Sequence, residues 1–195
     1  MKDAKIPDWF IGSCQKIKYM FPKAHAAAYV ISAFRIAWFK VHMPVYYYAS
    51  WLSTKATDFN VEAMIKGYDA IKEAIIEISN KGNEATNKDA GVSESLYLAL
   101  EATARGIKFE NVNLYKSEAT TFGVKDDKTI YPPFNSIDGL GDTVAKNIVS
   151  EREKREFISI EDLQKRCKIS TTLIDKMRLM GILDGMDESS QLSLF

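Results

Sequence analysis

Apolar positions recur along most of this chain at the spacing of an α-helix. From residue 23 onward, alanines and apolar residues follow this spacing up to Pro44, which predicts one long helix from about Lys23 to just before that proline. The helix is apolar all round, so we expect it to be buried. A shorter helix is predicted over residues 8–20, with Lys16 and Lys18 outside its apolar side.

The middle of the chain predicts a second group of helices. Apolar residues on one side and charged residues on the other indicate an amphipathic helix that begins at a cap on Asp58 or Asn60 and ends near Asn80. Residues 83–91 are polar and rich in turn formers, so we expect a solvent-exposed loop there. A further helix is predicted over residues 93–105.

Two other stretches of the middle do not show a simple amphipathic pattern. Residues 45–52 are dense in aromatic side chains, which suits either a base-stacking platform or packing between helices. Core packing is favoured, because stacking platforms interleave basic residues and none lies between Val45 and Ser53. Between residues 107 and 130 the helical period is lost, which predicts extended or irregular structure.

A glycine pattern follows the boundary that Pro132 and Pro133 predict. Residues 137–148 resemble the helix-hairpin-helix signature at every position. Gly139 and Gly141 flank Leu140, so the backbone can turn sharply and approach a phosphate without a Cβ in the way. We expect Leu140 to anchor the hairpin in the core, while the glycines, the amide of Thr143 and the side chain of Lys146 face the DNA backbone. The alternative is an ordinary glycine turn between helices.

A second helical pair is predicted over residues 157–184, as the degenerate partner of a tandem. Ser159 is expected to cap residues 160–166, and Thr171 or Thr172 to cap residues 173–180. Several cations of this region are candidates for further phosphate contacts, although interspersed glutamates leave a solvated charged face as the alternative. These cations are Arg152, Lys154, Arg155, Lys165, Arg166 and Lys168.

Composition indicates a globular protein. Of 195 residues, 46% are hydrophobic and 11% aromatic, and no long uncharged apolar run or apolar leader occurs, so we expect a soluble, cytoplasmic protein. Cys14 and Cys167 are far apart, and the two histidines lack metal-ligand spacing, so we expect neither a disulfide nor a metal site.

The net charge is zero, but the charges are segregated along the chain. Residues 1–50 carry seven Lys/Arg against two Asp/Glu, and residues 144–180 carry nine against six, whereas residues 51–143 carry ten against fifteen. Two basic regions therefore flank an acidic middle, and these basic regions are the candidate nucleic-acid contacts.

The start of the long helix combines three features that favour an anion. Lys23 and His25 lie in its first turn, directly after Pro22, where unpaired amides and the helix dipole attract negative charge. A phosphate site is one interpretation, and a capping lysine with a hydrogen-bonded histidine is the other. A small enzyme that uses His25 as a base is disfavoured, since no nucleophile or acid stands at a recognisable spacing.

A resemblance to a known family favours the phosphate interpretation. The run FPKAHAAAYVISAFRIAWFKVHMPVYYYASW is similar to the fingers region of replicative bacterial family C DNA polymerases. The preceding residues 7–10 and 16–20 make it closest to the PolC type, and the rest of the chain follows the PolC C-terminus. The resemblance implies that Lys23 and His25, with Lys16, Lys18 and Arg35, lie near the triphosphate of the incoming nucleotide. It also implies that the chain is a C-terminal piece of a longer polymerase.

The last five residues suggest a tethering peptide. Gln191, Leu192, Leu194 and Phe195 resemble the pentapeptide with which bacterial replication proteins bind the sliding clamp. A polar spacer precedes them, and the apolar side chains need a partner to cover them. The alternative is a tail that folds back onto its own domain.

The sequence thus predicts a mainly α fold with little β structure. Residues 1–131 form the fingers segment with its connector, residues 132–186 a tandem helix-hairpin-helix domain that binds duplex DNA, and residues 187–195 a flexible tail with the clamp motif. The palm carboxylates that hold Mg²⁺ in the parent polymerase are not in this chain, so we expect it to bind no cofactor and to be inactive alone. Expected partners are primer–template DNA, the deoxynucleoside triphosphate, the sliding clamp and the remainder of the polymerase. The rival hypothesis is a stand-alone, non-enzymatic DNA-binding and clamp-tethering accessory protein.

Overall fold

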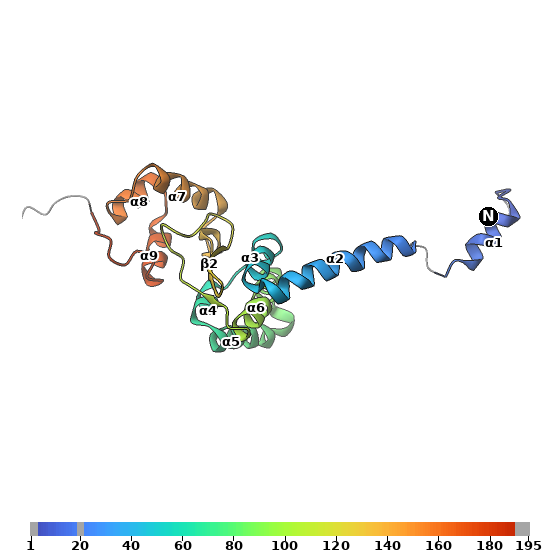
Figure 1. Cartoon of the computed structure of the whole chain (residues 1–195). Coiled ribbons are helices and arrows are strands. Elements are labelled where there is room, and N and C mark those ends of the chain that lie inside the picture. Colours follow the sequence, from blue (N-terminus) through green and yellow to red (C-terminus); the bar gives the residue numbers. More distant parts are fainter. Residues whose placement is uncertain (1–3, 19–21, 190–195) are drawn as a thin grey trace, which may run out of the picture. The chain divides into compact units, whose positions relative to one another are not determined.

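The computed structural model describes residues 4–18 and 22–189 (Figure 1). The chain divides into two compact units, one ending at Val41 and the other beginning at His42. Each unit is described by itself. Within the described ranges, no helix combines the length and hydropathy that crossing a membrane requires.

The first unit contains helix α1 (Asp8–Lys16) and nearly all of helix α2 (Lys23–His42). Helix α1 ends four residues earlier than the pattern predicts, because Ile17 adopts extended backbone with ψ 105°. Helix α2 has the predicted bounds, but the expectation that it is buried is wrong for this chain: none of its residues is buried, and Phe34 is 73% exposed. A helix that is apolar all round therefore presents its side chains uncovered.

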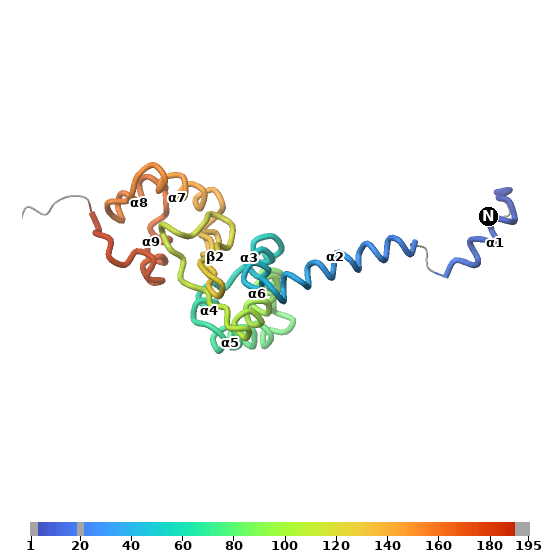
Figure 2. The backbone as a smooth tube through the Cα atoms, viewed as in Figure 1, coloured from blue at the N-terminus to red at the C-terminus, as the bar shows by residue number. Residues whose placement is uncertain are grey.

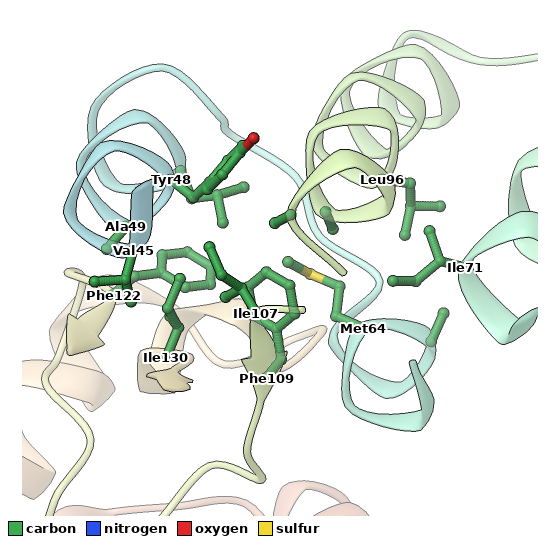
Figure 3. Packing of buried hydrophobic residues seen from close by; sticks show 14 of the residues in the cluster. Val45, Tyr48, Ala49, Met64, Ile71, Leu96, Ile107, Phe109, Phe122 and Ile130 are labelled. Atoms are coloured by element: carbon green, nitrogen blue, oxygen red, sulfur yellow. The ribbon is translucent and has the colours of Figure 1, made fainter. Parts of the chain in front are cut away.

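The second unit begins with four helices and a small sheet that share one core. The helices are α3 (Pro44–Thr54), α4 (Val61–Lys66), α5 (Tyr68–Asn80) and α6 (Asn87–Ala104). Tyr48 and Leu52 of α3 are fully buried, which confirms that the aromatic stretch packs in a core. Figure 3 shows Tyr48 and Val45 on one side of this cluster and Leu96, Ile71 and Met64 on the other.

Two details of these helices differ from the sequence expectations. The single helix predicted up to Asn80 is broken at Gly67, where a backbone φ of +94° ends α4 before α5 begins. Of the two predicted caps, Asn60 is the one that caps α4, since its side chain accepts from the Ala63 amide at 3.1 Å. The loop predicted over residues 83–91 is helical from Asn87, because Thr86 and Asp89 form a reciprocal capping box. Polar residues there mark an exposed first turn and not a loop.

The stretch without helical period contains the only strands among the described residues. Strand β1 (Lys108–Phe109) runs parallel to β3 (Thr129–Tyr131), and β2 (Gly123–Asp126) pairs with β3 antiparallel, giving the order β1-β3-β2. Ile130 lies opposite both Phe109 and Val124 and is fully buried. The sheet thus seals one side of the first core (Figure 3).

The remaining helices surround a second core. They are α7 (Asp142–Lys154), α8 (Ile160–Cys167) and α9 (Thr171–Leu179), preceded by a 3₁₀ turn at Phe134–Ser136. Figure 2 follows the backbone through these helices, which pack in sequence order. Ser159 caps α8 as expected, but α9 is capped by Ser170 and not by a threonine, since Ser170 Oγ accepts from the Leu173 amide at 3.3 Å. The mainly α fold with little β structure is confirmed.

The break at Gly67 can be tested by one substitution. A Cβ at Gly67 meets nothing within 4 Å, so Gly67→Ala acts through the backbone alone, and we expect it to lower the free energy of unfolding by about 1–3 kcal/mol. Gly123→Ala is the matched control, because its backbone has no positive φ and a Cβ there makes ordinary contact at 3.8 Å. Equal stability of the two variants in urea titrations would contradict this account of the break.

Candidate nucleic-acid interface

The glycine pattern forms a tight turn whose apolar residue is anchored in the second core. The Leu140 amide donates to the carbonyl of Ile137 at 2.9 Å, and Gly139 between them has φ +88°. This is the arrangement of a type II turn, which requires a glycine-like residue at its third position. Leu140 is 2% exposed and belongs to the second core, so the turn is held by its own side chain.

The two glycines serve different purposes. A Cβ on Gly139 meets Leu173 Cδ2 at 3.6 Å, and the positive φ already restricts this position to glycine. Gly141 has an ordinary φ of −74°, and a Cβ there meets nothing within 4 Å. The fold therefore needs glycine at 139, whereas at 141 it leaves the space in front of the backbone open.

Gly141 is also the N-cap residue of α7, and it has no side chain that could accept from the first-turn amides. The neighbouring helices α8 and α9 satisfy the same position with serine hydroxyls, at 3.1 and 3.3 Å. Uncapped amides at a helix start, with the positive end of the dipole, bind phosphate oxygens. The carboxylate of Asp142, the first residue of α7, accepts instead from the side-chain amide of Asn135 at 3.0 Å.

The other predicted contacts of the hairpin, Thr143 and Lys146, lie on the same helix. Thr143 lies in the first turn of α7 and Lys146 one turn later, and both side chains are exposed. A phosphate at the amides would therefore have a hydroxyl and an ammonium on the same helix within the next turn.

Two of the candidate cations are instead part of the fold. Arg166 is 14% exposed, donates to Glu151 and Asp162 at 3.1 and 3.2 Å, and lies 4.5 Å from the ring centre of Phe157. Arg152 is 10% exposed and donates to the Leu114 and Ser117 carbonyls. The interpretation of these two arginines as phosphate contacts is therefore wrong, because their donors are already used inside the second core.

The remaining candidates stay at the surface. Lys154, Arg155 and Lys165 are exposed and paired with acids of their own or the neighbouring helix. Lys168 is exposed at the end of α8, in left-handed backbone with φ 55°. Only the pair of Lys165 with Glu161 joins two exposed charges, and such a pair contributes little to stability, so Lys165 can exchange its acid for a phosphate at small cost.

Two features of the described residues concern reactive groups and metal ligands. Burial raises the pKa of the Cys167 thiol to about 12, so this cysteine stays protonated and is not a nucleophile at neutral pH. Among residues 4–18 and 22–189 no group of His, Cys, Asp and Glu has the arrangement of a metal site.

The predicted nucleotide contacts lie in the first unit. Lys23 and His25 occupy the first turn of α2 as expected, and the His25 ring stacks edge-on against Tyr29 with 4.6 Å between centroids. Lys16 ends α1 and Lys18 follows it, both exposed. Arg35 is exposed but about 15 Å along the helix axis from His25. Lys23 and His25 thus share the first turn of α2, and Arg35 lies further along the same helix.

The predicted clamp motif, Gln191, Leu192, Leu194 and Phe195, lies outside the described residues. The last described segment is tied to α8, since the Ile160 amide donates to the backbone carbonyl of Asp187 at 2.9 Å and the Glu161 amide to that of Glu188 at 3.1 Å.

One contact of the hairpin was not predicted from the sequence. Lys88, in the first turn of α6, lies 2.6 Å from the carboxylate of Asp138, the residue before Gly139. Fifty positions separate the two residues. No periodicity or motif connects them, so only the packing of α6 against the hairpin region reveals the pair.

Comparison with known proteins agrees with this geometry. A model of the helix-hairpin-helix motif matches residues 106–192, so the turn and the helices that follow it lie in a segment with this motif. Sequences named DNA polymerase III PolC-type match all of this chain, at 53% identity in Halalkalibacterium halodurans, 51% in Caldanaerobacter subterraneus and 50% in Bacillus subtilis. The chain spans 14% of the length of each. It therefore belongs to the PolC-type DNA polymerase III family, as a segment with a helix-hairpin-helix motif, and the resemblance predicted from its sequence is confirmed.

The structural role of Arg166 leads to a prediction. Arg166→Met removes five hydrogen bonds and leaves the Glu151 and Asp162 carboxylates without this partner, so we expect the melting temperature to fall by about 5 °C or more. Arg178→Met is the control, because Arg178 pairs with Asp175 and Glu188 at the surface. Thermal unfolding followed by circular dichroism measures the melting temperatures of both variants. If both melting temperatures fell by the same small amount, the contacts of Arg166 would not stabilise the fold more than a surface ion pair does.

Proposed function

We propose that this chain is the part of a PolC-type replicative DNA polymerase that the resemblance places at its C-terminus, and that it holds duplex DNA through the hairpin before α7. The observation that carries the proposal is the uncapped start of α7 behind the open backbone of Gly141. Amides presented in this way recognise the phosphate backbone whatever the base sequence. A replicative polymerase needs this kind of contact, because it must hold every sequence equally.

The tandem arrangement supports the same role. Helices α8 and α9 follow the hairpin and α7 and have serine caps in place of open glycine backbone. They support α7 through the shared second core, with Leu163, Ile174 and Met177 fully or nearly fully buried. Its exposed cations provide the weaker, sequence-independent attraction that adds to one specific phosphate contact.

The first unit is proposed to face the incoming nucleotide in the whole polymerase. Lys23 and His25 at the start of α2 suit a triphosphate, with Lys16, Lys18 and Arg35 as further cations. Catalysis would come from palm carboxylates and Mg²⁺ elsewhere in the polymerase, so this chain alone is proposed to be inactive and to bind no metal.

The remainder of the polymerase is the proposed partner of α2. This helix has no buried residue, and its exposed aromatic side chains include Tyr29, Phe34 and Trp38. Exposed apolar surface of this extent marks an interaction site. Because the chain spans 14% of its relatives, the missing polymerase domains are the natural cover, which favours the polymerase segment over a stand-alone accessory protein.

The C-terminal peptide is proposed to tether the polymerase to the sliding clamp in the cytoplasm. In this proposal the Gln191 amide orients the peptide by hydrogen bonds, and Leu192, Leu194 and Phe195 fill apolar clefts on the clamp. A tether raises the effective concentration of DNA at the hairpin, so both contacts reinforce one another.

The hairpin contact is tested by giving α7 the cap that it lacks. In Gly141→Asp the carboxylate caps the first-turn amides and repels phosphate, so we expect duplex affinity to fall more than tenfold while the melting temperature stays within a few degrees. Ser170→Asp is the matched control, since it makes the same charge change at the cap of α9 and should leave binding nearly intact. An ordinary glycine turn would give the two variants the same duplex affinity in a fluorescence titration.

The tether is tested by deletion of residues 191–195. We expect binding to purified sliding clamp to be lost, because the peptide supplies the whole contact, while the melting temperature and duplex affinity without clamp are unchanged. The control is the triple substitution of Leu192, Leu194 and Phe195 by serine, which keeps the length of the chain. A large loss of melting temperature would show instead that the tail packs on its own domain.

A further inference from the structure

A carboxylate lies directly beside the proposed phosphate site. Asp138 precedes Gly139 in the hairpin, and 60% of its side chain is exposed. A hydrogen bond from Lys88 lowers the pKa of Asp138, so this group is ionised at neutral pH. A bare negative charge next to amides that receive phosphate opposes DNA binding, and the hairpin therefore needs a cation to compensate it.

Two lysines from different elements reach this carboxylate. Lys88 of α6 lies 2.6 Å from Asp138 Oδ1, and Lys176 of α9 lies 3.5 Å from Oδ2 and 3.2 Å from the Asp138 carbonyl oxygen. Lys176 belongs to the helix-hairpin-helix match, whereas Lys88 lies outside residues 106–192. The shorter contact to the hairpin thus comes from a helix that is not part of the motif.

The surroundings make Lys88 difficult to replace. A cavity of about 300 Å³ separates the hairpin from residues 57–59, and Lys88 lines it together with Asp58 and Asp138. Asp138, Asp58 and Asp89 all raise the pKa of Lys88, so this lysine is the charged neighbour of three acids. Without the positive charge of Lys88, the carboxylates of Asp58 and Asp138 would leave the surface beside the hairpin more negative.

We propose that Lys88 is a positioning residue of the duplex interface, which neutralises Asp138 and so permits a DNA phosphate to approach the amides of residues 139–143. The inference rests on the proposed duplex binding by the hairpin. The inference adds that a residue of helix α6, outside the motif, raises the affinity of the hairpin for DNA through the charge pair between Lys88 and Asp138. Lys88 acts through Asp138 and does not itself contact the phosphate.

The first test compares two charge-equivalent substitutions in the full chain. Lys88→Met should weaken binding of a fluorescent primer–template duplex about fivefold at low salt, with the difference shrinking as salt rises, because the effect is a screened repulsion. Lys125→Met is the control: it removes the same charge from an exposed pair with Glu110, in which the charged atoms lie 2.5 Å apart, and neither residue lines the cavity at the hairpin. Both melting temperatures should stay close to the wild type, since both pairs are exposed. Equal affinity of the two variants would overturn the inference.

A double-mutant cycle separates compensation from direct contact. Asp138→Asn should bind duplex at least as tightly as the wild type, and Lys88→Met added to it should have almost no further effect, because no carboxylate remains to be neutralised. If Lys88→Met weakened binding equally in both backgrounds, Lys88 would contact DNA directly and the inference would be wrong. Weaker binding by Asp138→Asn alone would overturn it as well, since Asp138 would then hold the hairpin in place.

DNA binding by the wild-type chain, Gly141→Asp and Lys88→Met together separates the role of Lys88 from the proposed duplex binding by the hairpin. Binding that is lost in Gly141→Asp but insensitive to Lys88→Met would leave the hairpin assignment intact and remove only the role of Lys88. No binding by the wild-type chain at low salt would overturn both.

Discussion

The proposed function depends on how one turn is held. Leu140 is buried in the second core while the residues on either side of it must leave that core, and only glycine at position 139 allows the chain to make this bend. The bend ends at Gly141, where the backbone is open in front and α7 begins behind. The buried Leu140 thus positions the first-turn amides of α7, which no side chain of the N-cap residue Gly141 can cap.

The rest of the second unit can be understood as support for this turn. Arg152 of α7 donates to the Leu114 carbonyl in a neighbouring loop, and Arg166 of α8 donates to the carboxylates of Glu151 in α7 and Asp162 in α8. These contacts fix α7, whose start is the proposed phosphate site. Lys88 reaches the turn from α6, which belongs to the first core. The first unit differs from the second because the apolar side chains of its helix α2 are exposed and form no core. A segment that spans 14% of its relatives is expected to have such a surface where it meets the remainder.

Local patterns in the sequence predicted those features that depend on near neighbours. The bounds of α2, the cap at Asn60 and the hairpin were all accessible, because periodicity, capping and glycine spacing act within a few residues. The break at Gly67 was missed because an apolar period continues through it, and the start of α6 was missed because a polar first turn resembles a loop. The pairs of Arg166 with Glu151 and of Lys88 with Asp138 could not be assigned from sequence, since the partners lie 15 and 50 positions apart. A cation in a sequence can bind a phosphate or a carboxylate, and only the fold shows which is near.

The most direct test of the account is a titration of two fluorescent primer–template duplexes of unrelated sequence against the wild-type chain over a series of salt concentrations. If the hairpin holds the phosphate backbone, the two duplexes bind with equal affinity, and the logarithm of that affinity falls with the logarithm of salt with a slope of about −2 or steeper. Affinity that differs strongly between the sequences, or that does not change with salt, would contradict backbone recognition by these amides.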